Sequence, residues 1–330
     1  MSRLRFGAML AGFVALTALG VWWAAPPRDE LARTWAELRS LGIANVLGLV
    51  ALGLAAIGAE MLRLVVFGRV LGVRVSWRAA FDASVANDLF SWISPGGLAG
   101  EPASVYVMSR RGVPVDAALA ITFGKFATSF ALIMGAACVL LALGHGPAIP
   151  TWAIASIVAT IGFGVVLVGG FVVGAWFPAR SLRTIDRWLA TPRGPLVTRA
   201  LTGLRSSIAR LAQFRAGPAG WLAMTATHVL YYGAYIGLVV ALGAMFDARS
   251  IAGLVPIAIV YQAFTYIAPA PGIPEAGAAA FFGGLVPDGG AFVVVLLFRA
   301  LTAYLQIVLG LVYLPVGGML RAIVSRSDRA

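Results

Sequence analysis

Residues 92–112 read WISPGGLAGEPASVYVMSRRG, and this stretch decides how the rest of the chain is interpreted. Two prolines, four glycines and a glutamate interrupt an otherwise apolar sequence at a point where a membrane span would continue. Irregular backbone persists at membrane depth only where it is packed inside protein or lines a polar cavity. The stretch is therefore either a kink or short loop between full spans, or broken backbone held inside the membrane to build a site.

The composition identifies the chain as an integral membrane protein. Of its 330 residues 60% are hydrophobic and 12% are charged, and the mean hydropathy is +0.91. A soluble domain carries about 25% charged residues. The net charge of +12 comes from arginines in short segments between apolar stretches, which is typical of membrane topology signals and not of a nucleic-acid groove, so we expect no nucleic-acid partner. One cysteine, Cys138, excludes an intrachain disulfide.

Six stretches are long and apolar enough to cross a bilayer, whose hydrocarbon core needs about 20 helical residues. They are residues 6–25, 43–66, 115–144, 151–176, 219–245 and 291–318. We interpret the first as a retained span because its apolar run is long for a signal peptide and lacks a clean cleavage site. The sequence thus predicts an all-α polytopic membrane protein.

Arginine positions predict the orientation. Residues 67–78, the segment 177–218 and the C-terminal tail are rich in arginine, whereas 143–151 carries no formal charge. The positive-inside rule places both termini and these basic segments in the cytoplasm of a bacterial inner membrane. We call 177–218 the basic connector and interpret it as an amphipathic segment on the cytoplasmic surface, with a solvated connector as the alternative.

Two further regions, 79–112 and 251–290, are too interrupted to be simple spans. Each holds an apolar segment, a Pro/Gly turn, a glutamate and a shorter segment of small residues. Six crossings already account for the charge asymmetry, so we interpret both as re-entrant hairpins that enter from opposite faces. Such breaks at corresponding positions of two halves, 1–176 and 219–330, indicate an inverted repeat with a midplane site within one membrane domain, 1–330. Eight full spans are the alternative.

Lys125 is the strongest candidate for a functional side chain. It lies ten residues into an apolar stretch, about 15 Å deep, where an ionised group needs a cavity, a carboxylate or a bound anion. Arg299 lies eight residues into the last stretch and could either pair with Glu275 or hold a phosphate. Glu60 and Arg63, spaced i and i+3, predict an interfacial ion pair with a structural role.

Glu101 and Glu275 each follow a Pro/Gly turn and begin a helical stretch, where the helix dipole favours a carboxylate. The only histidines are His145 and His228, and we interpret His228 as a packed residue. The sequence has no HExxH, Walker, CxxC or serine-elbow motif and no cluster of metal ligands. We therefore expect no cofactor, no metal and no enzymatic activity, although catalysis within the membrane stays open.

The turn motifs PGGLAGE, residues 95–101, and PAPGIPE, residues 269–275, occur together with Arg299. With these elements the chain resembles, over nearly its whole length, the flippase-like membrane family typified by the transmembrane domain of lysylphosphatidylglycerol synthases. It differs at residues 102–104, Pro-Ala-Ser, near which the family often has an arginine. Because the chain ends at Ala330, we expect no soluble aminoacyl-transferase domain and no aminoacyl transfer.

The resemblance implies that the protein translocates or presents a lipid with a polar head group, anionic or glycosylated, between leaflets. Lys125 and Arg299 would neutralise the head group, and helix N-termini at the turns would add backbone donors. The predicted substrate-binding residues are Gly96, Gly97, Glu101, Lys125, Pro271, Gly272, Glu275 and Arg299. Alternatives are a non-transporting accessory subunit of a lipid- or glycan-modifying enzyme and a lipid-linked transferase.

Overall fold

The computed structural model describes most of the chain. The described residues are 3–25, 42–94, 99–144, 177–192, 194–212, 217–246, 250–267, 277–286 and 290–316. A few isolated residues between these ranges are described as well. Within them the chain forms helices and turns and no strand. The helices are α1 (Arg3–Ala24), α3 (Ile43–Val70), α4 (Trp77–Ile93), α5 (Gly100–Arg110), α6 (Val115–Ala142), α8 (Pro178–Leu189), α9 (Pro195–Ala212), α10 (Pro218–Met245), α11 (Ile251–Ile267), α13 (Ala278–Phe282), α14 (Gly290–Arg299), the π-helical turn η2 (Ala300–Tyr304) and α15 (Leu305–Val316).

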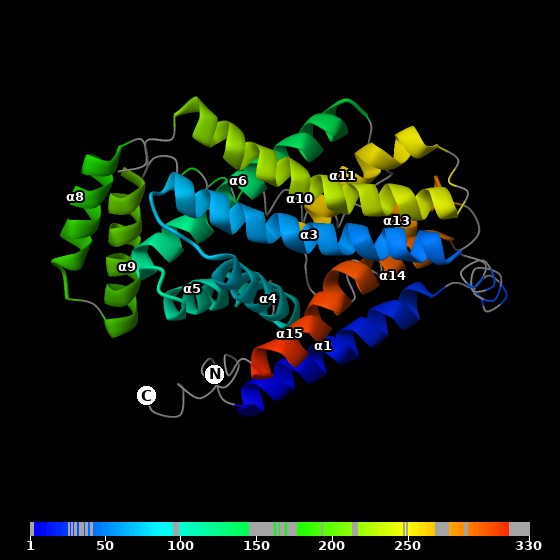
Figure 1. Cartoon of the computed structure of the whole chain (residues 1–330), viewed down its shortest axis with the longest axis horizontal. Coiled ribbons are helices and arrows are strands. Elements are labelled where there is room, and N and C mark those ends of the chain that lie inside the picture. The colour runs from blue at the N-terminus through cyan, green and yellow to red at the C-terminus, as the bar shows by residue number, and fades with distance from the viewer. Residues whose placement is uncertain are drawn as a thin grey trace.

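The described helices confirm a polytopic all-α membrane protein. Four are long and apolar enough to cross a bilayer: α3, α6, α10 and the continuous helix from α14 through α15. The shorter apolar helices α1 and α11 lie beside them, and α3 packs along α10 through the length of the bundle (Figure 1). Of the six predicted spans, 151–176 lies outside the continuously described residues.

Helices α4 and α5 pack closely against each other within the predicted region 79–112 (Figure 1). Ser76 begins α4 by accepting a hydrogen bond from the backbone of Ala79 at 3.2 Å. Gly100 permits the close approach of α5, because a Cβ there would lie 2.6 Å from the backbone oxygen of Asn87 and 1.8 Å from Ser91 Oγ. The first turn of α5, which carries the predicted site residue at position 101, therefore lies directly on α4.

Helix α15 closes the bundle on α4. A Cβ at Gly310 would lie 2.8 Å from Leu89 Cβ, so the two helices approach so closely that a larger residue than glycine would not fit there without a shift. The fully buried carboxylate of Asp82 pairs with Arg111 and accepts a hydrogen bond from the Tyr313 hydroxyl at 2.7 Å. One buried carboxylate thus joins α4 to the α5–α6 turn and to the last described helix.

The basic connector contains two amphipathic helices, α8 and α9, which pack against each other and, through α9, on α6 (Figure 1). Arg205 binds Asp186 at 2.6 Å between the two helices, and this hydrogen bond raises the pKa of Arg205. Arg210 binds Asp116 at the start of α6 at 2.7 Å. The first ion pair joins the two helices of the basic connector, and the second fixes α9 at the N-terminal end of α6.

Two clusters of buried apolar side chains fill the bundle and leave a polar layer between them. One cluster combines α4 and α5 with the C-terminal part of α3 and the N-terminal part of α6, and the other combines α10, α11 and α14 with the remaining parts of α3 and α6. Along α3 the clusters are separated by Glu60 and Arg63, and along α6 by Lys125. Glu60 lies ten residues from the end of α3 and Lys125 ten from the start of α6, each about 15 Å along its helix.

Candidate functional site

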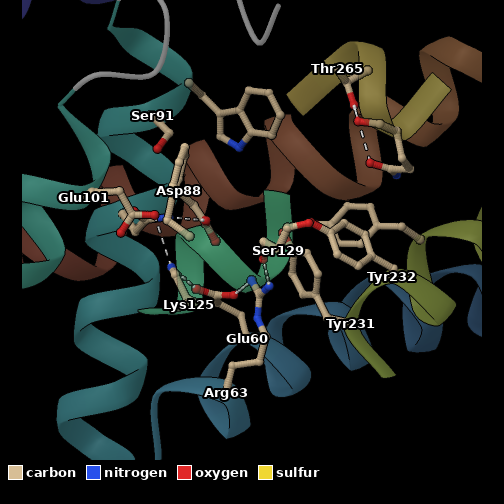
Figure 2. A pocket seen from close by; sticks show the side chains of 15 residues that line it. Glu60, Arg63, Asp88, Ser91, Glu101, Lys125, Ser129, Tyr231, Tyr232 and Thr265 are labelled. Atoms are coloured by element: carbon tan, nitrogen blue, oxygen red, sulfur yellow. Dashed lines mark hydrogen bonds and ion pairs between the residues drawn. The ribbon is translucent and has the colours of Figure 1, made fainter. Parts of the chain in front are cut away.

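A cavity of about 190 Å³ lies at the level of the polar layer. Its walls come from α3, α4, α5, α6, α10 and α11, and its charged side chains converge from opposite sides (Figure 2). This volume is smaller than the roughly 300 Å³ of the smallest drug-sized sites. The charged residues that line the cavity are Glu60, Arg63, Asp88, Glu101 and Lys125.

Glu60 is the centre of an ion-pair network in one wall. Its Oε1 lies 2.7 Å from Lys125 Nζ, and its Oε2 pairs with Arg63. Lys125 Nζ also lies 3.4 Å from Glu101 Oε1, and Arg63 Nη1 donates to Ser129 Oγ at 2.8 Å. Glu60, Arg63 and Lys125 are each at most 3% exposed. Buried charges are retained only when they are paired and hydrogen-bonded, and each of these three buried charges has an ion-pair partner in the network.

Tyrosines of α10 form an aromatic wall beside the network (Figure 2). The Arg63 guanidinium lies 3.6 Å from the centroid of the Tyr231 ring, a cation–π contact. The Tyr231 hydroxyl donates to the Tyr235 hydroxyl at 3.5 Å, and the Tyr232 hydroxyl donates to the backbone oxygen of Ser129 at 3.4 Å. The aromatic wall therefore fixes the guanidinium and leaves tyrosine side chains facing the cavity.

A hydrogen-bonded chain joins this wall to the last span. Trp92 Nε1 donates to Gln306 Oε1 at 3.0 Å, and Gln306 Nε2 donates to the Tyr235 hydroxyl at 3.4 Å. Arg299, fully buried, places its guanidinium 4.4 Å from the centroid of a Trp92 ring. The π-helical turn η2 lies between Arg299 and Gln306, and such turns occur frequently at functional sites.

Four cavity residues have buried polar atoms with no hydrogen-bond partner among the described residues. They are the acceptors Asn87 Oδ1 and Glu101 Oε2 and the donors Arg63 Nε and Gln262 Nε2. An unsatisfied buried polar atom costs about 1–3 kcal/mol, so such atoms are normally satisfied by water or a ligand. Their presence around one cavity indicates a site that is built to hold a polar group.

The structure brings two of the predicted substrate-binding residues, Glu101 and Lys125, to the same cavity. Arg299 is not among the lining residues, but its guanidinium contacts the indole ring of Trp92, which lines the cavity. The other five predicted residues lie outside the described residues: Gly96, Gly97, Pro271, Gly272 and Glu275.

The prediction of an interfacial ion pair is half right. Glu60 and Arg63 do pair, but both are buried in the cavity wall instead of lying at the membrane surface. The reason is that Lys125 reaches the same depth from α6, and Glu60 binds both cations at once. Spacing along one helix predicts the first contact, whereas the second depends on how α3 and α6 pack.

Sequence reasoning missed Asp88, Asn87 and Gln262, although a signal for the first two was present. Asn87 and Asp88 are adjacent polar residues in an alanine-rich helix, and intramembrane polar groups mark functional sites by default. His228 is packed as predicted: it is fully buried, with ring nitrogens 2.9 Å from Met224 O and 3.2 Å from Lys125 O. Within the described part of the chain, no group of His, Cys, Asp and Glu could hold a metal ion.

Comparisons with known proteins identify the family. A search of curated proteins and a search of solved structures each give no significant match. The family model of the lysylphosphatidylglycerol synthase TM region, by contrast, matches residues 9–310. Since this match covers most of the 330 residues, the chain belongs to the lysylphosphatidylglycerol synthase transmembrane-region family.

Proposed function

We propose that this protein translocates a polar-headed lipid between the leaflets of a bacterial inner membrane, or presents it across the midplane. The observation that carries the proposal is a charged cavity between two apolar clusters, at matching depth on α3 and α6. Polar sites near the midplane of a helical bundle are typical of transport proteins. Membership of a family named for a lipid-modifying synthase supports a lipid as the substrate.

The cavity is suited to the head group alone. Its volume of about 190 Å³ leaves no room for acyl chains, which would stay in the surrounding bilayer while the head group crosses the apolar layer. Glu101 is the member of the network with the most accessible side chain, at 32% exposed. In this proposal Glu101 meets the incoming head group first, and the buried pair of Glu60 and Lys125 keeps the cavity polar when no lipid is bound.

We further propose a topology with both termini in the cytoplasm and two re-entrant hairpins that enter from opposite faces. Helices α4 and α5 would form the cytoplasm-facing hairpin, and 251–290 would form the periplasm-facing one. The tight packing of α4 on α5 supports a hairpin that moves as one unit. The two halves would rock against each other around the cavity, with no covalent chemistry on the lipid.

A lipid-translocation assay tests this function. Purified protein is reconstituted in vesicles that contain phosphatidylglycerol, phosphatidylethanolamine or a monoglucosyl diacylglycerol with a fluorophore on one acyl chain, and dithionite bleaches the outer leaflet. We expect the wild-type protein to make the inner-leaflet pool of at least one lipid accessible. Glu101→Gln should slow this movement, while Gly135→Ala, whose added Cβ would have no neighbour within 4 Å, should not.

Two results would refute the proposal. Folded wild-type protein that moves none of the three lipids would favour the non-transporting accessory subunit instead. Glu101→Gln protein that moves lipid at the wild-type rate would place the transport path elsewhere.

A further inference from the structure

We propose that the head group this cavity binds is uncharged and rich in hydroxyl groups, such as a single sugar ring, rather than anionic. This inference rests on the proposed function, since it names the substrate class of the same site. It replaces the initial expectation that Lys125 and Arg299 neutralise an anion.

The charged side chains of the cavity disfavour an anion. Two cationic side chains and three carboxylates line it, so its formal charge is negative by one. Lys125 already contacts the carboxylates of Glu60 at 2.7 Å and Glu101 at 3.4 Å, and Arg63 pairs with Glu60 as well. An anionic head group on Lys125 would compete with these carboxylates and meet the negative charge of the cavity, and displacement of Glu60 would leave a buried carboxylate without one of its cations, which is strongly unfavourable.

The unsatisfied polar atoms of the cavity include both acceptors and donors. Asn87 Oδ1 and Glu101 Oε2, on the α4–α5 wall, need a donor. Arg63 Nε, on α3, and Gln262 Nε2, on the α11 wall, need an acceptor. A phosphate oxygen only accepts and an ammonium only donates, but a hydroxyl group does both. A ligand with several hydroxyls on a rigid frame is therefore the class that satisfies both walls at once.

Part of the cavity lining is aromatic. Trp92, Phe126 and Tyr235 expose ring surface to the cavity between its polar groups. Aromatic side chains offer an apolar face, and tyrosine adds a polar edge. A sugar ring has the matching pattern, with C–H groups on its faces and hydroxyls around its rim. A cavity of about 190 Å³ suits one such ring and not an oligosaccharide.

The inference can be tested by lipid binding, without translocation, through the protection of an introduced thiol from labelling. The native thiol is removed by Cys138→Ser, and Thr265→Cys places a single thiol in the cavity lining. The purified protein is labelled with a maleimide in micelles that contain monoglucosyl diacylglycerol, phosphatidylglycerol or phosphatidylethanolamine with identical acyl chains. We expect the glucosyl lipid to slow labelling at least about fivefold and more than either phospholipid.

Two substitutions test whether the unsatisfied polar atoms bind the lipid that protects the thiol. Asn87→Ala and Gln262→Ala each remove one predicted hydrogen bond to the sugar, so the glucosyl lipid should bind about two- to tenfold more weakly. Gly135→Ala is the matched control and should bind as before. If the thiol variant fails to fold, native mass spectrometry of the wild-type protein with an equimolar mixture of the three lipids gives the same ranking.

Each outcome is decisive. Equal or stronger protection by either phospholipid, or no protection by the glucosyl lipid, overturns the inference. Protection and translocation of phosphatidylglycerol or phosphatidylethanolamine alone would leave the proposed function standing and reject the head-group class. Binding of the glucosyl lipid without translocation of any lipid would keep the class and reject transport.

Discussion

The substitution Glu60→Gln tests whether the polar layer is one connected network. Glu60 binds Lys125 through Oε1 and Arg63 through Oε2, and it is 2% exposed. Glutamine keeps the shape of the side chain but removes its charge. Lys125 would then keep only Glu101 among its described carboxylate partners, at 3.4 Å, and Arg63 would keep the Ser129 hydroxyl and the Tyr231 ring.

The expected cost follows from these distances. With an effective dielectric constant of about 20, Coulomb's law gives about 6 kcal/mol of attraction at the 2.7 Å of Lys125–Glu60 and about 5 kcal/mol at the 3.4 Å of Lys125–Glu101. Desolvation offsets most of each attraction, and removal of one partner from a buried pair costs about 3–5 kcal/mol. We expect Glu60→Gln to lower the free energy of unfolding by this amount.

SDS-induced unfolding in mixed micelles measures the effect. Glu101→Gln is the comparison, because Glu101 is partly exposed and its removal leaves the shorter Lys125–Glu60 contact intact; it should cost less than about 1.5 kcal/mol. The double variant Glu60→Gln/Lys125→Met should be less destabilised than the sum of the single variants, by about 1–3 kcal/mol. A loss below about 1 kcal/mol for Glu60→Gln, or strict additivity in the double variant, would refute the network.

Three further predictions follow from individual contacts. Asp82→Asn should destabilise the protein by about 2 kcal/mol in the same unfolding assay, because it weakens the partly buried ion pair with Arg111 that ties α4 to the α5–α6 turn, and a change under about 1 kcal/mol would contradict this role. Gly100→Ala should lower stability by about 1–3 kcal/mol through overlap with α4, whereas Gly135→Ala, with open space around its Cβ, should be neutral or slightly stabilising; equal effects would be inconsistent with the packing. In a Cys138→Ser background, Leu98→Cys should react with an impermeant maleimide from the cytoplasm and Ile273→Cys from the periplasm, and labelling of both from one side would rule out opposed hairpins.

The sequence predicts the helical membrane fold well because apolar length is a local property. The long helices α3, α6 and α10 coincide with predicted spans, and the amphipathic helices α8 and α9 lie in the predicted basic connector. Lys125 could also be predicted from depth alone, since a lysine about 15 Å along an apolar helix must meet a carboxylate, a cavity or an anion.

The partners of Lys125 could not be predicted, because they depend on tertiary packing. Glu60 is 65 residues away in the chain and meets Lys125 only because α3 and α6 cross at the same depth. Glu101 reaches the network because Gly100 lets α5 lie directly on α4. One sequence without packing information shows which polar groups are costly, but not which of them neutralise each other, and this is why the anion-binding expectation differs from the observed pairing.

The measurement that tests the central claim most directly is the lipid content of the purified protein. Native mass spectrometry of wild-type protein extracted from its own membranes in a mild detergent should show a retained lipid with a polar head group. The Glu101→Gln and Asn87→Ala variants should retain less of it, and the control Gly135→Ala should retain as much as the wild type. If all four proteins retained the same lipid in equal amounts, this result would contradict a head-group site in this cavity.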